Sequence, residues 1–269
     1  MRPFQRYHFP ELPSTNDKAK ELSRRYAVNE FLAVTTDLQT SGRGRNGKVW
    51  LGRANENVYC SLAVRHGIMS GLAKNAQGLT ANLAVYQAIG SLAALQAIRS
   101  FLPPMQRHTA QLKYPNDVYL LTAAYERKKV CGVLVEHEFL GAECIGSIIG
   151  IGINVRQTEF PAELAVKASS LLACGIDVEV EDVMAALLRE SEKYCELYAL
   201  SGRKDSAQAA FSEWWRELAL EGVRVAVSGT EGAWTALRLQ EDGSLLVRHT
   251  ESGETRVVMN GDSLVRLDW

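Results

Sequence analysis

The spacing of apolar residues separates a long first region of mixed helices and strands from a short last region of strands alone. Apolar positions with a helical period predict helices over residues 18–26, 78–99, 180–200 and 206–218. Apolar runs with β-forming residues predict strands over 31–36, 58–64, 111–113, 118–121, 130–137 and 145–154. The links between the later strands are too short for crossover helices, so we expect largely antiparallel pairing.

After residue 221 the pattern changes to short strands separated by glycine-containing turns. These strands are predicted over residues 223–227, 233–239, 245–248, 255–259 and 264–267. Ser-Gly, Asp-Gly and Asn-Gly pairs between them are typical of hairpin turns. A stretch of about 48 residues supports only a small core. We therefore predict two domains, residues 1–221 and 222–269, the second of them a small β-barrel.

Composition and charge narrow the class of protein. The 269 residues are 46% hydrophobic and 23% charged, as in ordinary globular proteins, and the net charge of −1 gives no overall field that would attract nucleic acid or a membrane. No apolar run reaches about 18 residues, and the N-terminus lacks a signal-peptide pattern. Five cysteines without a Cys-x-x-Cys pair indicate neither zinc nor disulfides, so we expect free thiols, a cytoplasmic location and no protein metal site.

The most informative segment is the basic loop, which we define as residues 42–48. It combines three glycines with two arginines and a lysine directly after a strand-like run. Glycines let the backbone approach a ligand and expose its N–H groups, while arginines offer forked donors to carboxylate and phosphate. The loop therefore predicts a local anion site, with a solvated basic turn as the plainer interpretation.

Two known phosphate-binding patterns match the loop only in part. The spacing Gly42-x-Gly44-x-x-Gly47 satisfies the dinucleotide fingerprint, and the P-loop pattern fails at Val49, where it requires Ser or Thr. Both patterns need a helix that begins at the loop, because the phosphate rests on its N-terminus. Residues 49–57 have no helical period, so we reject both interpretations.

Three further segments carry candidate chemistry. Residues 113–117, Lys-Tyr-Pro-Asn-Asp, form a turn between two strands. In residues 132–136 and 150–154, glycines within apolar strands mark close approach of another backbone or of a flat ligand. Asn154 offers an amide that could match the donor–acceptor edge of adenine. The alternatives are a simple strand corner and simple core strands.

Taken in order, these segments resemble the motifs of the biotin protein ligases. The resemblance rests on Ser-Thr-Asn at 14–16, the loop at 39–47, Trp50, the corner at 113–117 and the strands at 132–136 and 150–154. It extends from about Phe9 to Trp269. It implies an α+β fold related to class II aminoacyl-tRNA synthetases, with a mixed, largely antiparallel sheet and a C-terminal SH3-like barrel.

The resemblance also implies the reaction. Biotin and ATP form biotinyl-5′-adenylate and pyrophosphate, and a lysine of a biotin carboxyl carrier protein then takes the biotin and releases AMP. Mg²⁺ is implied as a companion of ATP, held mainly by phosphate oxygens. Two anions must meet, so local positive charge has to offset their repulsion.

Residue roles follow from the resemblance by position. Residues that line the biotin pocket are Ser14, Thr15, Asn16 and Gln39. Arg43, Gly44 and Arg45 are implied to wrap biotin and the adenylate phosphate. The further residues implied to bind biotin or ATP are Gly42, Trp50 and Gly132. Lys113 is implied to bind the carboxylate and the α-phosphate, and with Arg43 and Arg45 it forms the catalytic set. Asn154 is implied to lie beside adenine, and Arg266 to reach back toward the nucleotide.

The chain departs from the family pattern at several points. Tyr114 replaces the usual tryptophan and Asn46 a frequent third arginine, and we expect little change from either. The Ser-Thr-Asn motif begins at residue 14, which leaves no room for the N-terminal DNA-binding domain of some members, so we expect no nucleic-acid partner. A homodimer is compatible with exposed sheet edges. The alternatives are a lipoate or octanoate ligase, whose Arg-Arg-x-x-Gly-Gly-Gly signature is absent, and a non-catalytic binding protein.

Overall fold

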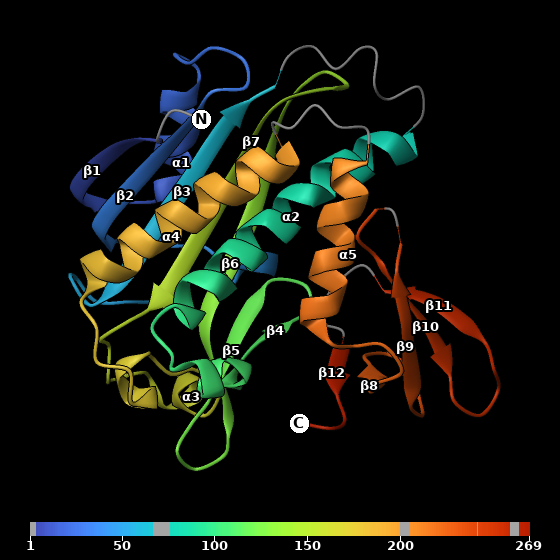
Figure 1. Cartoon of the computed structure of the whole chain (residues 1–269). Helices are drawn as coiled ribbons and strands as arrows, with labels where there is room; N and C mark the ends of the chain where they lie inside the picture. Colours follow the sequence, from blue (N-terminus) through green and yellow to red (C-terminus); the bar gives the residue numbers. More distant parts are fainter. Residues whose placement is uncertain (1–3, 67–75, 200–204, 241, 259–263) are drawn as a thin grey trace.

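A seven-stranded mixed sheet in the order β1-β2-β3-β7-β6-β5-β4 dominates the first region (Figure 1). The computed structural model describes residues 4–66, 76–199, 205–240, 242–258 and 264–269. The strands are β1 Gln5–Leu12, β2 Phe31–Gln39, β3 Asn57–Arg65, β4 Ala110–Lys113, β5 Asp117–Leu121, β6 Arg127–Leu140 and β7 Glu143–Asn154. β1 pairs with β2 in parallel, and every other neighbouring pair in this sheet is antiparallel.

Helices cover the two faces of the sheet unequally. Helix α1 (Thr15–Ser23) packs on one face, where its N-cap Ser14 accepts a hydrogen bond from the Asp17 backbone N–H. Helices α2 (Ala76–Arg99) and α4 (Val180–Tyr194) cross the other face, as Figure 1 shows. The short helix α3 (Ala162–Ala165) follows β7, and α5 (Ser206–Leu218) packs against α2 and the C-terminal sheet.

Alternation along the strands gives the two faces different chemistry. On β3, Val58, Cys60 and Leu62 belong to the large apolar core with α2 and α4. Their neighbours on the same strand point to the α1 side, where register aligns one row of residues across the sheet. The row runs Lys113, Asp117, Gly132, Gly152, Tyr59 and Thr36.

The C-terminal region forms a five-stranded antiparallel sheet in the order β11-β10-β9-β8-β12. Its strands are β8 Arg224–Val227, β9 Trp234–Leu239, β10 Leu245–His249, β11 Thr255–Val258 and β12 Leu264–Arg266. Left-handed glycines such as Gly229, Gly243 and Gly253 form the turns. Apolar side chains of this sheet join the same core as α2 and α5.

These observations confirm the α+β class, the mostly antiparallel sheet and all five C-terminal strands that the sequence predicted. Strand β1 was missed, because its residues are mostly half-exposed or exposed and include Pro10. The helix predicted over residues 180–200 is α-helical only to Tyr194, and a π-helical turn follows it to Ala199. Leu200 and Met259, the predicted ends of a helix and a strand, lie outside the described residues. No described helix is both long and apolar enough to cross a membrane. The domain division at residue 221 stays a prediction.

Candidate active site

A buried polar network joins the start of α1 to the sheet. The side-chain oxygen of Gln39, at the end of β2, accepts hydrogen bonds from the Thr15 N–H at 2.8 Å and the Thr15 hydroxyl at 3.0 Å. Ser61 Oγ on β3 lies 2.7 Å from Thr15 Oγ1 and 2.6 Å from Asn16 Oδ1. Asn16 in turn donates its amide N–H to Glu136 at 2.6 Å. Because buried polar groups need partners, this network fixes each side chain in one orientation.

Arg43 extends this network to the surface. Its guanidinium donates two hydrogen bonds of 2.7 Å to the Asp17 carboxylate and lies 3.6 Å from Glu136. The bond from Arg43 lowers the pKa of Asp17, and the same pair raises the pKa of Arg43. The first arginine of the basic loop is therefore held beside the Thr15–Asn16 end of the site.

The basic loop folds back on itself as a small hairpin. Arg43 and Val49 form an antiparallel bridge, the Gly44 N–H donates to the Lys48 carbonyl, and the Trp50 N–H donates to the Gly42 carbonyl. A Cβ at Gly42 would lie 2.6 Å from the Trp50 carbonyl oxygen, so this position requires glycine. The residues after the loop, 49–57, contain no helix, in agreement with our rejection of the two phosphate-loop patterns.

Paired glycines form a flat floor between β6 and β7. Gly132 and Gly152 are direct partners, and Cβ atoms added at them would lie 2.8 and 2.6 Å from the Trp50 indole. The flat group that lies over these glycines is thus the Trp50 indole of this chain, not a ligand. The indole Nε1 is buried and has no hydrogen-bond partner in the described part of the chain.

Lys129 lies at the edge of this floor. Its Nζ is 5.4 Å from the centre of the Trp50 ring and 2.7 Å from Asp117 Oδ1. A Cβ at Gly132 would lie 3.1 Å from the same ammonium group. The lysine side chain is 28% exposed, so its charge lies at the partly open edge of the floor that Trp50 covers.

The 113–117 corner contacts the basic loop through Asn116 and Arg45. Arg45 donates to the Asn116 side-chain oxygen at 3.2 Å, and the Asn116 amide donates to the Val133 carbonyl at 2.9 Å. The Lys113 ammonium lies 5.3 Å from the centre of the Tyr119 ring. Asn116 and Asp117 therefore connect the corner to two cations of the site, Arg45 and Lys129.

Asn154 ends β7 in a defined orientation. Its amide N–H donates to the Ser169 carbonyl at 2.9 Å, and the side chain is buried. Its Oδ1 has no hydrogen-bond partner in the part of the chain that the structure describes. A buried acceptor normally has a partner, so this oxygen marks an unsatisfied position at the end of β7.

Comparison with known proteins identifies the family. A family model described as "Biotin/lipoate A/B protein ligase family" matches residues 9–154, which include the polar network, the loop, the floor and the corner. The chain belongs to this family.

Individual relatives agree with this assignment to the biotin/lipoate A/B protein ligase family. The chain is 30% identical to the "Biotin--[acetyl-CoA-carboxylase] ligase" of Mycobacterium tuberculosis over 86% of this chain and 77% of that protein. It is 34% identical to the "Bifunctional ligase/repressor BirA" of Bacillus subtilis over 71% of this chain, but spans only 54% of that relative's length. The structure of the biotin protein ligase from Aquifex aeolicus in complex with biotin and ATP superposes with a TM-score of 0.69, at 27% identity, and covers 97% of this chain and 99% of that one.

For this family member, most predicted site residues lie on the α1 side of the sheet. Interactions join Thr15, Asn16, Gln39 and Arg43 at one end, and Arg45, Trp50 and Gly132 contact the corner or the floor. Arg266 is engaged elsewhere: its guanidinium donates to Asp268 at 2.9 and 2.7 Å and to the Leu218 carbonyl at 3.2 Å. Its role at the nucleotide stays a prediction, as do the other residue roles.

Sequence reasoning missed four residues that complete this arrangement. They are Asp17, Ser61, Lys129 and Glu136. The sequence predicts Glu136 only as the last residue of the segment 132–136, and it gives Lys129 no separate role. The available signal for Lys129 was its position three residues before Gly132, but strand register was needed to assign the side chain to the site face.

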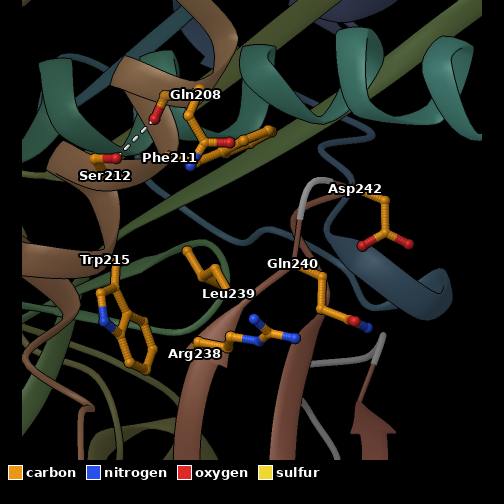
Figure 2. A pocket seen from close by; sticks show the side chains of 8 residues that line it. All are labelled: Gln208, Phe211, Ser212, Trp215, Arg238, Leu239, Gln240 and Asp242. Atoms are coloured by element: carbon orange, nitrogen blue, oxygen red, sulfur yellow. Dashed lines mark hydrogen bonds between the residues drawn. The ribbon is translucent and has the colours of Figure 1, made fainter.

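Two cavities lie outside the floor. The larger, of about 580 Å³, separates α5 from β9 and the turn after it, and Figure 2 shows Trp215 and Phe211 on one side with Arg238 and Gln240 on the other. The smaller, of about 170 Å³, is lined by Arg45, Tyr114 and Pro115 among others. Among the described residues, no group of three or more His, Cys, Asp or Glu could hold a metal ion.

Proposed function

We propose that this chain is an ATP-dependent biotin protein ligase. In the first step, a carboxylate oxygen of biotin attacks the α-phosphorus of ATP, and the bond to the leaving pyrophosphate breaks. In the second, a lysine amine of a biotin carboxyl carrier protein attacks the acyl carbon, loses a proton and displaces AMP. The observation that carries the proposal is the set of uncharged side chains Thr15, Asn16, Gln39 and Ser61, joined by hydrogen bonds, which lies with three cations along one sheet face.

The network suits the uncharged head of biotin. A ureido group has one carbonyl acceptor and two N–H donors, and Thr15, Asn16, Gln39 and Ser61 offer both kinds of partner in fixed orientations. Thr15, Asn16 and Ser61 are buried, which excludes competing water and strengthens their bonds. We therefore propose that biotin binds with its rings at this end and its carboxylate toward the cations.

The three cations suit the second substrate, ATP. Arg43, Arg45 and Lys129 reach the α1 side from the loop and from β6, and each already contacts a polar or charged group of the site. Fixed positive charge offsets the repulsion between carboxylate and triphosphate and stabilises charge that grows on the α-phosphate. We assign the closest role at the reacting atoms to Lys129 rather than to Lys113, because Lys129 borders the glycine floor. We keep Asn154 as the proposed partner of adenine.

Several finer assignments belong to the same proposal. Because the described acidic side chains form no three-ligand cluster, Mg²⁺ would be held chiefly by nucleotide phosphates. The five free cysteines, four of them buried, fit a reducing, cytoplasmic compartment. The division into a catalytic domain, 1–221, and a C-terminal domain, 222–269, and a homodimer formed through a sheet edge stay predictions.

Biotin-dependent exchange between ATP and labelled pyrophosphate tests the first step on the purified chain. We expect exchange with biotin and none with lipoate or octanoate. Exchange with lipoate would favour the other branch of the family, and no exchange with any acid would favour a non-catalytic binding protein. Transfer is then tested with a carrier domain and with the same domain in which the acceptor lysine is replaced by arginine.

A further inference from the structure

The 113–117 corner is held from both sides. Toward the site it presents Asn116 to Arg45 at 3.2 Å and Asp117 to Lys129 at 2.7 Å. A shift of the corner by an ångström would therefore move both contacts together. The groups that hold the corner from behind consequently influence the geometry of the site.

Tyr114 makes the principal contact on the other side. Its side chain is only 4% exposed, and its hydroxyl donates toward the Gly243 carbonyl at 3.0 Å and the Val258 carbonyl at 3.3 Å. Both acceptors belong to the C-terminal sheet, one in the β9–β10 turn and one at the end of β11. The ring also packs on Trp214 of α5, with a centroid distance of 5.8 Å. Burial raises the pKa of Tyr114, so the hydroxyl stays a donor.

A second contact joins the C-terminal region to the next strand. The Trp269 ring lies 5.3 Å from the Tyr119 ring of β5 and 5.0 Å from the Arg266 guanidinium of β12. Lys113 lies on the Tyr119 ring at 5.3 Å. Strand β5, which follows the corner, thus also contacts the C-terminal region.

We propose that Tyr114 is a positioning residue, whose hydroxyl fixes the 113–117 corner to the C-terminal sheet and so sets the positions of Asn116 and Asp117. A tryptophan would offer an indole N–H at a different place on its ring, so these bonds from a hydroxyl belong to the tyrosine that this chain carries. The expectation that this exchange would change little is therefore incomplete. The part of the inference that concerns activity rests on the proposed ligase function, and the part that concerns the corner does not.

The test is Tyr114→Phe, which removes the hydroxyl and keeps the ring. The matched control is Tyr194→Phe, because Tyr194 is equally buried and its hydroxyl donates to Glu213 at 2.8 Å, between α4 and α5. Amide hydrogen exchange is measured over residues 110–121 and 243–249, and biotin–ATP–pyrophosphate exchange kinetics are measured in parallel. Thermal unfolding of both variants shows whether their overall stabilities are similar.

We expect faster amide exchange in both segments for Tyr114→Phe and in neither for Tyr194→Phe. We also expect kcat for the adenylation step to fall about five- to tenfold in Tyr114→Phe, the ratio typical for one buried hydrogen bond, with the KM for biotin unchanged. Equal amide exchange in the two variants would overturn the proposal. If the wild-type chain adenylates no biotin, the proposed function fails, while amide exchange still decides the role of Tyr114.

Discussion

The two faces of strand β3 are equally buried but differ in chemistry. On β3, Val58, Cys60 and Leu62 face α2 and α4, whereas Asn57, Tyr59 and Ser61 face the candidate site, and none of the six is more than 1% exposed. The first set is stabilised by apolar contacts and the second by hydrogen bonds, such as that from Asn57 to Gln157 at 2.6 Å. The comparison teaches that substitutions on one face should act on folding and those on the other on ligand chemistry.

The largest expected effect is on catalysis, from Lys129→Met. Removing the cation that borders the glycine floor should lower biotin-dependent pyrophosphate exchange by about 100-fold or more, the scale found when one electrostatic stabiliser is lost. Steady-state exchange kinetics measure the effect. The matched control is Lys128→Met, because Lys128 is the adjacent lysine but contacts Glu126 and the Ala165 carbonyl.

Lys113→Met tests which of the two lysines, Lys113 or Lys129, lies at the reacting atoms. Lys113 shares the site face but lies on the Tyr119 ring, so we expect a smaller loss than for Lys129. A larger loss at Lys113 than at Lys129 would restore the assignment made from sequence and contradict the one made from geometry.

On the apolar face the expected effect is on stability. Ile149→Ala removes a fully buried side chain that packs near Gly90 of α2, and should reduce the free energy of unfolding by about 2–5 kcal/mol. Ser61→Ala on the opposite face should cost only about 1 kcal/mol but weaken biotin binding. Denaturant unfolding and calorimetry with biotin distinguish them. Reversed rankings in the two measurements would show that the faces are not divided as we describe.

The sequence predicted the elements well where apolar periodicity was strong. The strands of the core, α2 and the five C-terminal strands follow directly from that signal. Strand β1 was missed because an exposed edge strand has little apolar alternation, and its pairing with β2 needs contacts between segments far apart in the chain. Local patterns therefore identified the layers and the β4 edge of the sheet, but not the β1 edge.

The site was predicted in part for a related reason. The loop and the corner carry unusual residue types at fixed spacing, so they are visible in the sequence. Lys129 lies in a charged run, and adjacent strand residues point to opposite faces, so the choice between Lys128 and Lys129 depends on register. That register shifts at a bulge between Val118 and Tyr119, which no local pattern encodes.

Two histidines are a polar exception on the apolar face, and they predict a pH dependence of stability. His66 and His137 both contact Ser147 Oγ, at 2.7 and 2.8 Å, and burial lowers the pKa of each to about 4. The unfolded chain takes up their protons near pH 6.5, so stability should fall as the pH drops from about 6.5 to about 4. The slope approaches at most about 1.4 kcal/mol per pH unit for each histidine.

Urea unfolding between pH 7 and pH 4.5 tests this dependence. The variant His66→Gln/His137→Gln should flatten the profile, whereas His108→Gln, which changes an exposed histidine, should leave it unchanged. An unchanged slope in the double variant would mean that other groups dominate acid unfolding.

The smallest expected effect concerns the exposed end of the site face. Asp17 and Arg43 are 59% and 42% exposed, so their ion pair should contribute less than about 1 kcal/mol to stability in spite of its geometry. The same ion pair should weaken the binding of an anionic ligand, because the ligand must compete with the Asp17 carboxylate for Arg43. Asp17→Asn should therefore lower the KM for ATP a few-fold at low salt, and the difference should shrink as salt screens the charges. Glu21→Gln is the matched control, since Glu21 pairs with Lys18 on the same helix. A higher KM in Asp17→Asn than in Glu21→Gln would mean that Asp17 orients Arg43 for the ligand instead of competing with it.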